Sequence, residues 1–452
     1  MGKPGRRDAN HGDQVKHTRP TDLSVRPSAC PGLLRIVQAK DGGICRIKLP
    51  CGRLSAVQAR AVAAAASVHA SGLIEATNRS NLQVRGVRAG AELALIEALL
   101  AAGLGADTPS ADDVRNLMVS PLAGLDPSAL VDISPLAEQL LALLQGKPHL
   151  HALSPKFALL LDGGEAMAML DHPHDIWLAA MGRSEDALFA FGLAGCPPQA
   201  KDDAPALAAV RRAQVPALVE ALLDLFLELA TPEQTRMRHL LANYPEGDLL
   251  LRLQQRLALP LLPAGEWRRA APRPFAHLGI CDGRHVGGAP ALGRLDSTQL
   301  SALAELADTY GDGSLRLTPW QSVLLPNTGD AAACLGAMQA LGLSTDAREP
   351  LARLIACTGS AGCAKGLADT KADALALVPL LPAGAVAHLS GCPRSCAAAH
   401  VAPLTLLAAG PGRYDLYQRG GAGFGRLLAR DLSIQEAGER LAASPDTWSS
   451  TP

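Results

Sequence analysis

The sequence predicts an α+β fold built around an internal pseudo-twofold repeat. Residues 52–77 and 293–318, which lie 241 positions apart, are identical at nine of 26 positions when aligned without a gap. In each copy a short strand precedes the tripeptide Gly-Arg-Leu, a helix follows it, and a strand with alternating apolar residues ends the copy. The period is too long for a solenoid, so two copies that pair about a pseudo-twofold axis are the better interpretation.

The element predictions follow from these patterns. Helices are expected over residues 55–68 and 296–309, and alternating strands over 74–84 and 315–325. Between the copies, a Leu-rich helix is expected over 134–145. The region 168–270 is predicted to be mostly helical, because ALVEALLDLFLELA is amphipathic and LLRLQQRLALPLL follows it.

Four cysteines near the C-terminus form two pairs with unequal gaps, CTGSAGC and GCPRSC. The pairs are Cys357 with Cys363 and Cys392 with Cys396. Small residues between them let the backbone curl around an iron–sulfur cube and direct N–H groups at sulfur. A structural zinc site is the nearest alternative, but its cysteines are usually two to four residues apart. Ordinary buried cysteines are the other alternative.

Composition excludes several classes of protein. The 48% hydrophobic and 19% charged residues are typical of a globular chain, and a net charge of −1 argues against a dedicated nucleic-acid binder. The apolar stretches are interrupted by acidic residues such as Glu97, so no membrane span is expected. The other six cysteines have no paired spacing, which favours a reducing compartment, the cytoplasm.

Several segments together resemble the nitrite and sulfite reductase family over about residues 30–418. They are the two cysteine pairs, the duplicated Gly-Arg-Leu unit, IEATNRSNLQVRG, DVRNLMVSPLAG and PKFALLLDGG. The resemblance implies two ferredoxin-like half-domains that pair, and two halves of a 4Fe-4S and tetrapyrrole domain. The expected parts are a disordered leader (1–29), ferredoxin-like half 1 (30–105), the first cluster-domain half with a helical region (106–270), ferredoxin-like half 2 (271–345), the 4Fe-4S-binding half (346–443) and a tail (444–452).

The same resemblance implies a cationic pocket for a polycarboxylate tetrapyrrole. Arg79 in TNR, Arg115 in VRN and Lys156 in PKF fall on the family's basic positions, and Arg46, Lys48 and Arg85 are further candidates. For any one of them a solvated surface charge is the alternative. The sulfite reductase pattern has a second lysine where this chain has Ala158, and an asparagine where it has Trp320. Both changes suit a pocket for a large organic substrate.

Within the family, CPGLLRIVQAKDGGICRIKLP and CTGSAGCAKGLADTK most resemble a branch that acts in aerobic cobalamin synthesis. That branch uses O2 to hydroxylate precorrin-3A at C20 with closure of a γ-lactone. A sirohaem-dependent nitrite or sulfite reductase and a non-catalytic cluster protein are the alternatives. No catalytic residue is assigned.

The resemblance also implies a mononuclear non-haem iron and an external electron donor, either a ferredoxin or an NADH-linked reductase. Iron ligands could come from HPHD at 172–175 or from further His and Asp residues, none with diagnostic spacing: His277, Asp282, His285, His388 and His400. The Gly-rich GGAGFG at 420–425 lacks the surroundings of a dinucleotide site and is expected to be a hairpin turn. Lys365, Lys371 and Arg394 could offset cluster charge or dock an acidic partner.

Overall fold

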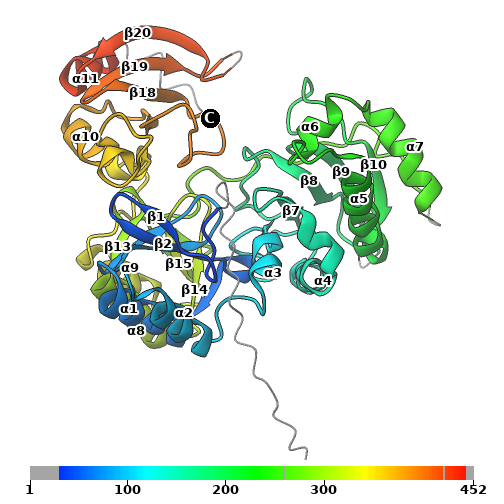
Figure 1. Ribbon diagram of the computed structural model, residues 1–452, viewed down its shortest axis with the longest axis horizontal. Coiled ribbons are helices and arrows are strands. Elements are labelled where there is room, and N and C mark those ends of the chain that lie inside the picture. The colour runs from blue at the N-terminus through cyan, green and yellow to red at the C-terminus, as the bar shows by residue number, and fades with distance from the viewer. Residues whose placement is uncertain (1–29, 185, 258–259, 421–422, 444–452) are drawn as a thin grey trace, which may run out of the picture.

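The computed structural model describes residues 30–443 except 185, 258–259 and 421–422 (Figure 1). The expected leader and tail lie outside the described residues. Four five-stranded sheets organise the described chain. Two of them form the unit at the lower left of Figure 1, a third lies with helices α4 to α7 at the right, and the fourth lies with α10 and α11 at the upper left.

The two sheets of the first unit exchange a strand. Their orders are β1-β2-β5-β4-β13 and β11-β12-β15-β14-β3, so each takes its last strand from the other copy of the repeat. This exchange confirms the pseudo-twofold architecture. The strands are β1 (Val37–Ala39), β2 (Gly42–Ile47), β3 (Arg53–Ser55), β4 (Leu73–Ala76), β5 (Leu82–Val87), β11 (Gly279–Cys281), β12 (His285–Gly288), β13 (Arg294–Asp296), β14 (Ser314–Leu317) and β15 (Val323–Leu325).

The helices of the two copies begin in the same way. Helix α1 (Ala56–His69) has a capping box between Ser55 and Gln58, and α8 (Ser297–Tyr310) has one between Asp296 and Gln299. In both, the cap side chain accepts the N–H three residues later, which satisfies an otherwise unpaired donor. The apolar faces of the two helices share one core with inner residues of eight of the ten strands, all but β1 and β11. Helices α2 (Glu92–Ala101) and α9 (Ala331–Ala340) also contribute to this core.

One strand prediction was wrong in both copies. The segments expected as single strands, 74–84 and 315–325, each form two strands joined by a turn. Ser80 (φ 55°) and Gln321 (φ 61°) hold the same left-handed position in these turns, 241 residues apart. Alternation of apolar residues continues across the turn, so periodicity alone did not reveal the break. The turn in the first copy carries Arg79.

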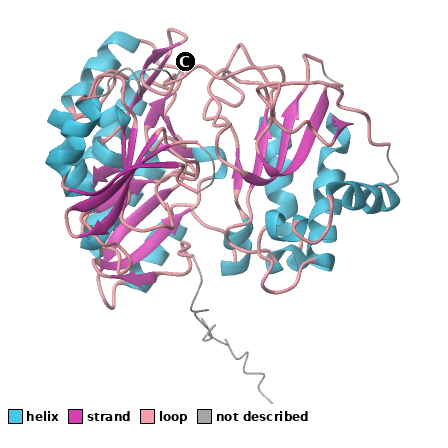
Figure 2. Ribbon diagram, turned by 90° about the horizontal axis from the view of Figure 1, so that it is seen from above, coloured by secondary structure: helices cyan, strands magenta, loops and turns pink. Residues whose placement is uncertain are grey.

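The third sheet has the order β10-β9-β8-β7-β6 and two different faces. Leu159, Leu161 and Ile176 pack against the helices, while Leu160 and Trp177 face the other way, toward Trp320. Figure 2 shows the helices of this part gathered on one side of its sheet. Its elements are α3 (Pro109–Val114), β6 (Leu117–Met118), α4 (Ser134–Gly146), β7 (Leu159–Asp162), β8 (His174–Ala180), β9 (Leu188–Gly195), β10 (Ala208–Arg211), α5 (Val215–Leu229), α6 (Met237–Leu241) and α7 (Glu246–Arg256).

The expectation of a mostly helical region over 168–270 was therefore wrong for its first part. Residues 174–211 contain three strands, and only the part from Val215 onward is helical. Strand β8 is buried on both faces, so it reads as a continuous apolar run without period-two alternation. The helices predicted around ALVEALLDLFLELA and LLRLQQR are confirmed as α5 and α7.

The fourth sheet repeats the third in order and direction. Strands β16, β17 and β18 are parallel and β19 and β20 return antiparallel, just as β6, β7 and β8 are parallel and β9 and β10 antiparallel. The third and fourth sheets are therefore a second duplicated pair in this chain. The elements are β16 (Leu354–Ala356), α10 (Thr370–Leu377), β17 (Ala387–Ser390), β18 (Leu404–Gly410), β19 (Arg413–Gln418), β20 (Arg426–Leu432) and α11 (Ile434–Ala442).

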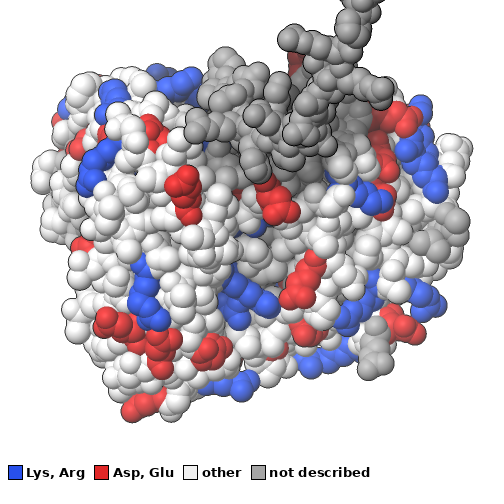
Figure 3. Space-filling view, turned by 60° about the horizontal axis from the view of Figure 1, so that its bottom comes forward, with Lys and Arg blue, Asp and Glu red and all other residues white. Residues whose placement is uncertain are grey.

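Charges are mixed over the surface. On the face shown in Figure 3, Lys and Arg side chains lie among Asp and Glu side chains, as the formal net charge of −1 predicts. Among the helices of the described residues, none has the length and apolar character needed to cross a membrane.

Candidate iron–sulfur and tetrapyrrole site

The four cysteines of the two pairs meet at one edge of the fourth sheet. Cys357 directly follows β16, and Cys392 lies two residues after β17. These strands are parallel neighbours, so both carboxyl ends lie on the same edge. Burial raises the pKa of the Cys396 thiol, and Cys392, Cys357 and Cys363 raise it further. Cys396 therefore lies within electrostatic range of all three other thiols.

The chain around Cys357 is shaped to donate hydrogen bonds to sulfur. The backbone N–H of Gly391 donates to the Cys357 Sγ at 3.2 Å, and the Thr370 hydroxyl lies 3.4 Å from it. The loop leaves no room for side chains at Gly359 (φ +67°), where a Cβ would lie 2.5 Å from the Thr370 nitrogen, or at Gly366. Hydrogen bonds to sulfur are among the features that tune iron–sulfur clusters.

The number and sequence spacing of these cysteines suit a cluster better than a single zinc ion. Within the described part of the chain, no three His, Cys, Asp or Glu side chains are grouped closely enough to hold one metal ion. Tetrahedral zinc needs four ligands at about 2.0–2.3 Å from one centre. A four-iron cube takes one thiolate on each iron, so its ligands stand apart. The four cysteines supply the number and type of ligand that a 4Fe-4S cluster takes.

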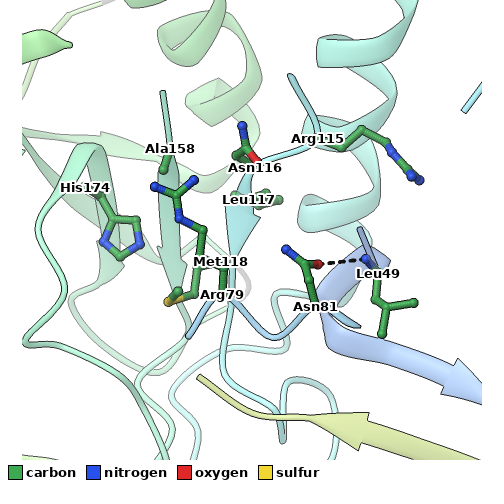
Figure 4. A pocket seen from close by; sticks show the side chains of 9 residues that line it. All are labelled: Leu49, Arg79, Asn81, Arg115, Asn116, Leu117, Met118, Ala158 and His174. Carbon is green, nitrogen blue, oxygen red and sulfur yellow. Dashed lines mark hydrogen bonds between the residues drawn. The ribbon is translucent and has the colours of Figure 1, made fainter. Parts of the chain in front are cut away.

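A small pocket lies between the first ferredoxin-like copy and the third sheet (Figure 4). It contains Arg79, Arg115 and the Ala158 position noted in the sequence, together with His174. Its lining residues are Leu49, Arg79, Asn81, Arg115, Asn116, Leu117, Met118, Ala158 and His174. Asn81 and Leu49 are held together in the pocket lining, because the Asn81 Oδ1 accepts the N–H of Leu49 at 2.8 Å.

Arg79 carries an unpartnered charge into this pocket. Its side chain makes no hydrogen bond or ion pair within the described residues, and its guanidinium lies among Ala158, Met118 and His174 in Figure 4. Burial, together with the neighbouring charges of Arg46 and Arg236, lowers the pKa of Arg79 to about 10. A buried cation without a partner is costly unless a ligand supplies the opposite charge.

Arg46 and Arg236 extend this cationic region. Among the described residues, the Arg46 side chain donates only to Gln83 (3.0 Å), and its Nε has no partner there. Arg236 pairs through its Nε with Asp175 at 2.9 Å, and Asp175 also accepts the N–H of Ala158. Arg79 and Arg236 thus share one carboxylate, that of Asp175, while Arg46 lies near Glu75; the excess of guanidiniums suits a polyanionic ligand. Arg46 also lies near Cys396, which places this region beside the cysteines.

The other predicted basic residues have different positions. Arg115 pairs with the buried Asp112 at 2.7 Å and donates to the Lys48 carbonyl, and its guanidinium turns away from Arg79 in Figure 4. Lys48 donates to two backbone carbonyls, and Arg85 pairs with the carboxylate of Asp41. Lys156 is exposed and does not line the pocket.

Four histidines surround the same region. The ring centroids of His172 and His400 lie 5.0 Å apart. His388 lies within electrostatic range of His400, and His174 lies within electrostatic range of His172. Each of the four has a buried ring nitrogen without a hydrogen-bond partner among the described residues. Burial lowers the pKa of all four, to about 3 for His174 and about 4 for His388, so they are neutral at pH 7.

In the second copy of the repeat, stacked aromatic rings fill the position that corresponds to Arg79. Trp320 occupies the place of Arg79, 241 residues later, and stacks on His277 with centroids 4.6 Å apart. It packs on the same apolar face as Met118, which lines the pocket. Where Asn would offer an amide, this chain therefore presents a large apolar surface.

The first half of the cluster domain has no cysteines at the equivalent positions. Gly164 takes the place of Cys392, two residues after β7, and a buried ion pair between Asp162 and Arg269 (2.6 Å) lies beside it. Glu165 is fully buried there. Burial raises the pKa of Glu165 to about 8, and the charge of Asp162 acts in the same direction.

This raised pKa predicts that stability falls with increasing pH. The folded state holds the Glu165 proton up to about pH 8, whereas the unfolded chain releases it near pH 4.5. We expect the free energy of unfolding to decrease between these values by a few kcal/mol, and Glu165→Gln to flatten the decrease. Urea denaturation of both chains from pH 5 to 8.5 measures this. Exposed Glu138→Gln is the control, and parallel curves for wild type and Glu165→Gln would contradict the assignment.

Two family models match the chain. The nitrite and sulphite reductase 4Fe-4S domain matches residues 110–258, and the nitrite/sulfite reductase ferredoxin-like half domain matches residues 36–102 and again 281–340. The repeated match falls on the two copies that exchange strands. The chain belongs to the nitrite and sulfite reductase family. The four cysteines lie outside these matches, in the second half of the cluster domain.

Nitrite reductases and a precorrin-3B synthase of this family are similar to the chain at nearly the same sequence identity. The chain is 30% identical over 394 residues to the chloroplastic ferredoxin–nitrite reductase of Zea mays, covering 79% of this chain and 68% of that protein. It is 30% identical over 417 residues to precorrin-3B synthase of a Sinorhizobium species, covering 89% and 85%. It is 31% identical over 396 residues to ferredoxin–nitrite reductase of Synechococcus elongatus, covering 80% and 76%. These family members are oxidoreductases.

A solved structure of the family has the same fold. The NirA protein of Mycobacterium tuberculosis superposes with a TM-score of 0.70 at 22% identity, over 88% of this chain and 79% of that chain. This likeness supports the fold class.

Proposed function

We propose that this chain is an oxygen-dependent mono-oxygenase that converts precorrin-3A to precorrin-3B in aerobic cobalamin synthesis. The reaction hydroxylates C20 and closes the ring A acetate as a γ-lactone. The observation that carries the proposal is the pocket: Arg79 brings an unpaired charge to it, and its wall has Ala158 in place of a lysine. The Sinorhizobium precorrin-3B synthase is also similar over most of both chains.

In this proposal the four cysteines ligate a 4Fe-4S cluster. When bound, the cluster would supply electrons, one at a time, to the reaction in the neighbouring pocket. Cys357, Cys363, Cys392 and Cys396 each hold one iron, and saturated irons of this kind suit electron delivery. Arg79 holds a substrate carboxylate, since a guanidinium can bind a carboxylate through two charge-assisted bonds. Arg46 and Arg236 are proposed to hold further carboxylates. Arg115 instead stabilises the pocket wall, and Lys156 lies at the surface.

A mononuclear non-haem iron, which the resemblance implies, has no assigned ligand set among the described residues. Such centres commonly use two histidines and a carboxylate on one ion. His172 and His400 are the nearest pair of imidazoles, but no third ligand is grouped with them in the described ranges. We therefore route no step through such an iron and assign no catalytic residue.

The electrons are proposed to come from a separate protein, a ferredoxin or an NADH-linked reductase, in the cytoplasm. The Gly-rich segment at 420–425 connects the antiparallel strands β19 and β20, whereas a dinucleotide site follows a parallel strand and opens a helix. Two residues of that segment lie outside the described part of the chain. The domain divisions given above remain proposals as well.

Isotope labelling tests the proposed reaction. The anaerobically purified chain is mixed with precorrin-3A, a chemical reductant and ¹⁸O2, and the product is weighed by mass spectrometry. We expect one labelled oxygen atom in the product, with the other atom of O2 reduced to water by the electron pair from the donor. A product without label, or no consumption of O2, would contradict the proposal.

A sirohaem-dependent nitrite or sulfite reductase is the second candidate, because the maize nitrite reductase is equally identical over its matched length. The visible spectrum separates the two. A reductase purified with its cofactor shows strong sirohaem bands and consumes nitrite or sulfite. The mono-oxygenase shows only the broad absorption of the cluster.

A further inference from the structure

A buried charge network lies directly behind the cysteine loop. Its centre is the carboxylate of Glu75 on β4, which is only 8% exposed. Three cations surround it: Arg294 at 3.0 Å, Arg85 at 3.5 Å and Lys371 at 3.6 Å. Glu75 and Arg294 are cross-strand partners, so the network sits at the seam where the two copies exchange strands.

The network touches the cysteine loop at two points. Lys371 directly follows Thr370, whose hydroxyl donates to the Cys357 carbonyl at 2.7 Å and lies 3.4 Å from its sulfur. Thr358, the residue after Cys357, donates its hydroxyl to Glu75 at 3.5 Å. Lys371 is fixed by a 2.6 Å hydrogen bond to the Leu292 carbonyl. Both charges are thus held in place close to one cluster ligand.

The charges persist at neutral pH. Burial opposes ionisation of Glu75, but Lys371, Arg85 and Arg294 outweigh burial and hold its pKa below the ordinary value. Burial lowers the pKa of Lys371 to about 8, against the opposing effect of Glu75. With the Asp41 partner of Arg85, the network contains three cations and two anions, so its net charge is positive.

We propose that Lys371 and Glu75 set the reduction potential of the cluster in opposite directions. Reduction adds a negative charge to a cluster that four thiolates already make anionic. A fixed cation nearby favours that charge and a fixed anion opposes it, and burial weakens the screening by water. Lys371 therefore raises the potential and Glu75 lowers it. This inference rests on the proposed ligation of a 4Fe-4S cluster by the four cysteines.

Opposite shifts in two variants test the inference. The wild-type holoprotein, Lys371→Met, Lys371→Arg and Glu75→Gln are purified anaerobically, and each is titrated with dithionite while the reduced cluster is followed by electron paramagnetic resonance. We expect a more negative midpoint potential in Lys371→Met, a value near wild type in Lys371→Arg, and a more positive one in Glu75→Gln. Lys365→Met, which removes an exposed cation two residues after Cys363, should shift the potential least.

The outcomes separate the inference from the proposed function. Intact clusters with unchanged potentials in Lys371→Met and Glu75→Gln, or shifts of the same sign in both, would overturn the inference. If Glu75→Gln does not fold, the contrast between Lys371→Met and Lys371→Arg still decides it. Absence of sulfide and of a cluster signal in the wild type would instead refute the proposed cluster.

Discussion

Arg79→Gln should lower kcat/KM for precorrin-3A by roughly 10- to 150-fold while leaving the melting temperature unchanged or higher. A hydrogen bond to a charged group is worth about 1.5–3 kcal/mol, and the loss should be found mainly in KM if Arg79 binds substrate before and during the reaction. Stability should not fall, because Arg79 has no partner within the described structure and its buried charge is destabilising without ligand. Steady-state kinetics and thermal unfolding measure the two effects.

Two neighbouring basic residues serve as controls with different expected results. Arg115→Gln should lower stability by about 3–5 kcal/mol, because it removes the ion pair of the buried Asp112 carboxylate, which then keeps the Leu33 N–H and the more distant Lys48 charge. Exposed Lys156→Gln should change neither property appreciably. An Arg79 variant that keeps wild-type kinetics, or that unfolds as Arg115→Gln does, would show that Arg79 is a structural residue.

Cys392→Ser should abolish the cluster and the activity together. A serine hydroxyl is a poor ligand for iron beside three thiolates, and the hydrogen bond of Gly391 N–H to Cys357 shows that the two loops form one site. We expect loss of the broad visible absorption and of acid-labile sulfide, with oxygenation of precorrin-3A undetectable.

Cys196→Ser is the matched control, because Cys196 is half-buried and follows β9 of the third sheet, whereas the paired cysteines lie at the edge of the fourth. It should retain iron, sulfide and activity. Retention of the cluster in Cys392→Ser would require another fourth ligand, and loss of the cluster in both variants would point to general misfolding.

The sequence predicted the duplicated architecture because its signals were local and occurred twice. The Gly-Arg-Leu turn, the capping pairs Ser55–Gln58 and Asp296–Gln299 and the helices after them all recur at the same offset. Exchange of β3 and β13 between sheets could not be read from either copy, since it depends on pairing between residues about 240 positions apart. The cysteine pairs were equally readable, because ligand spacing is a property of the chain.

The sequence was less informative about which basic residues face the pocket. Arg115 has a motif context as strong as that of Arg79, yet a buried carboxylate one helical turn away neutralises it. Arg236 was missed because it lies just before α6, in a segment without a family motif, and only the fold brings it near Arg79. The histidines at 172 and 400 were noted as candidates, but their approach depends on two different sheets.

The most direct test of the account is elemental analysis of the anaerobically purified chain together with its visible spectrum. The account predicts about four irons and four acid-labile sulfides per chain, with no sirohaem bands. Zinc in place of iron and sulfide would contradict it, because the electron source beside the pocket would then be absent.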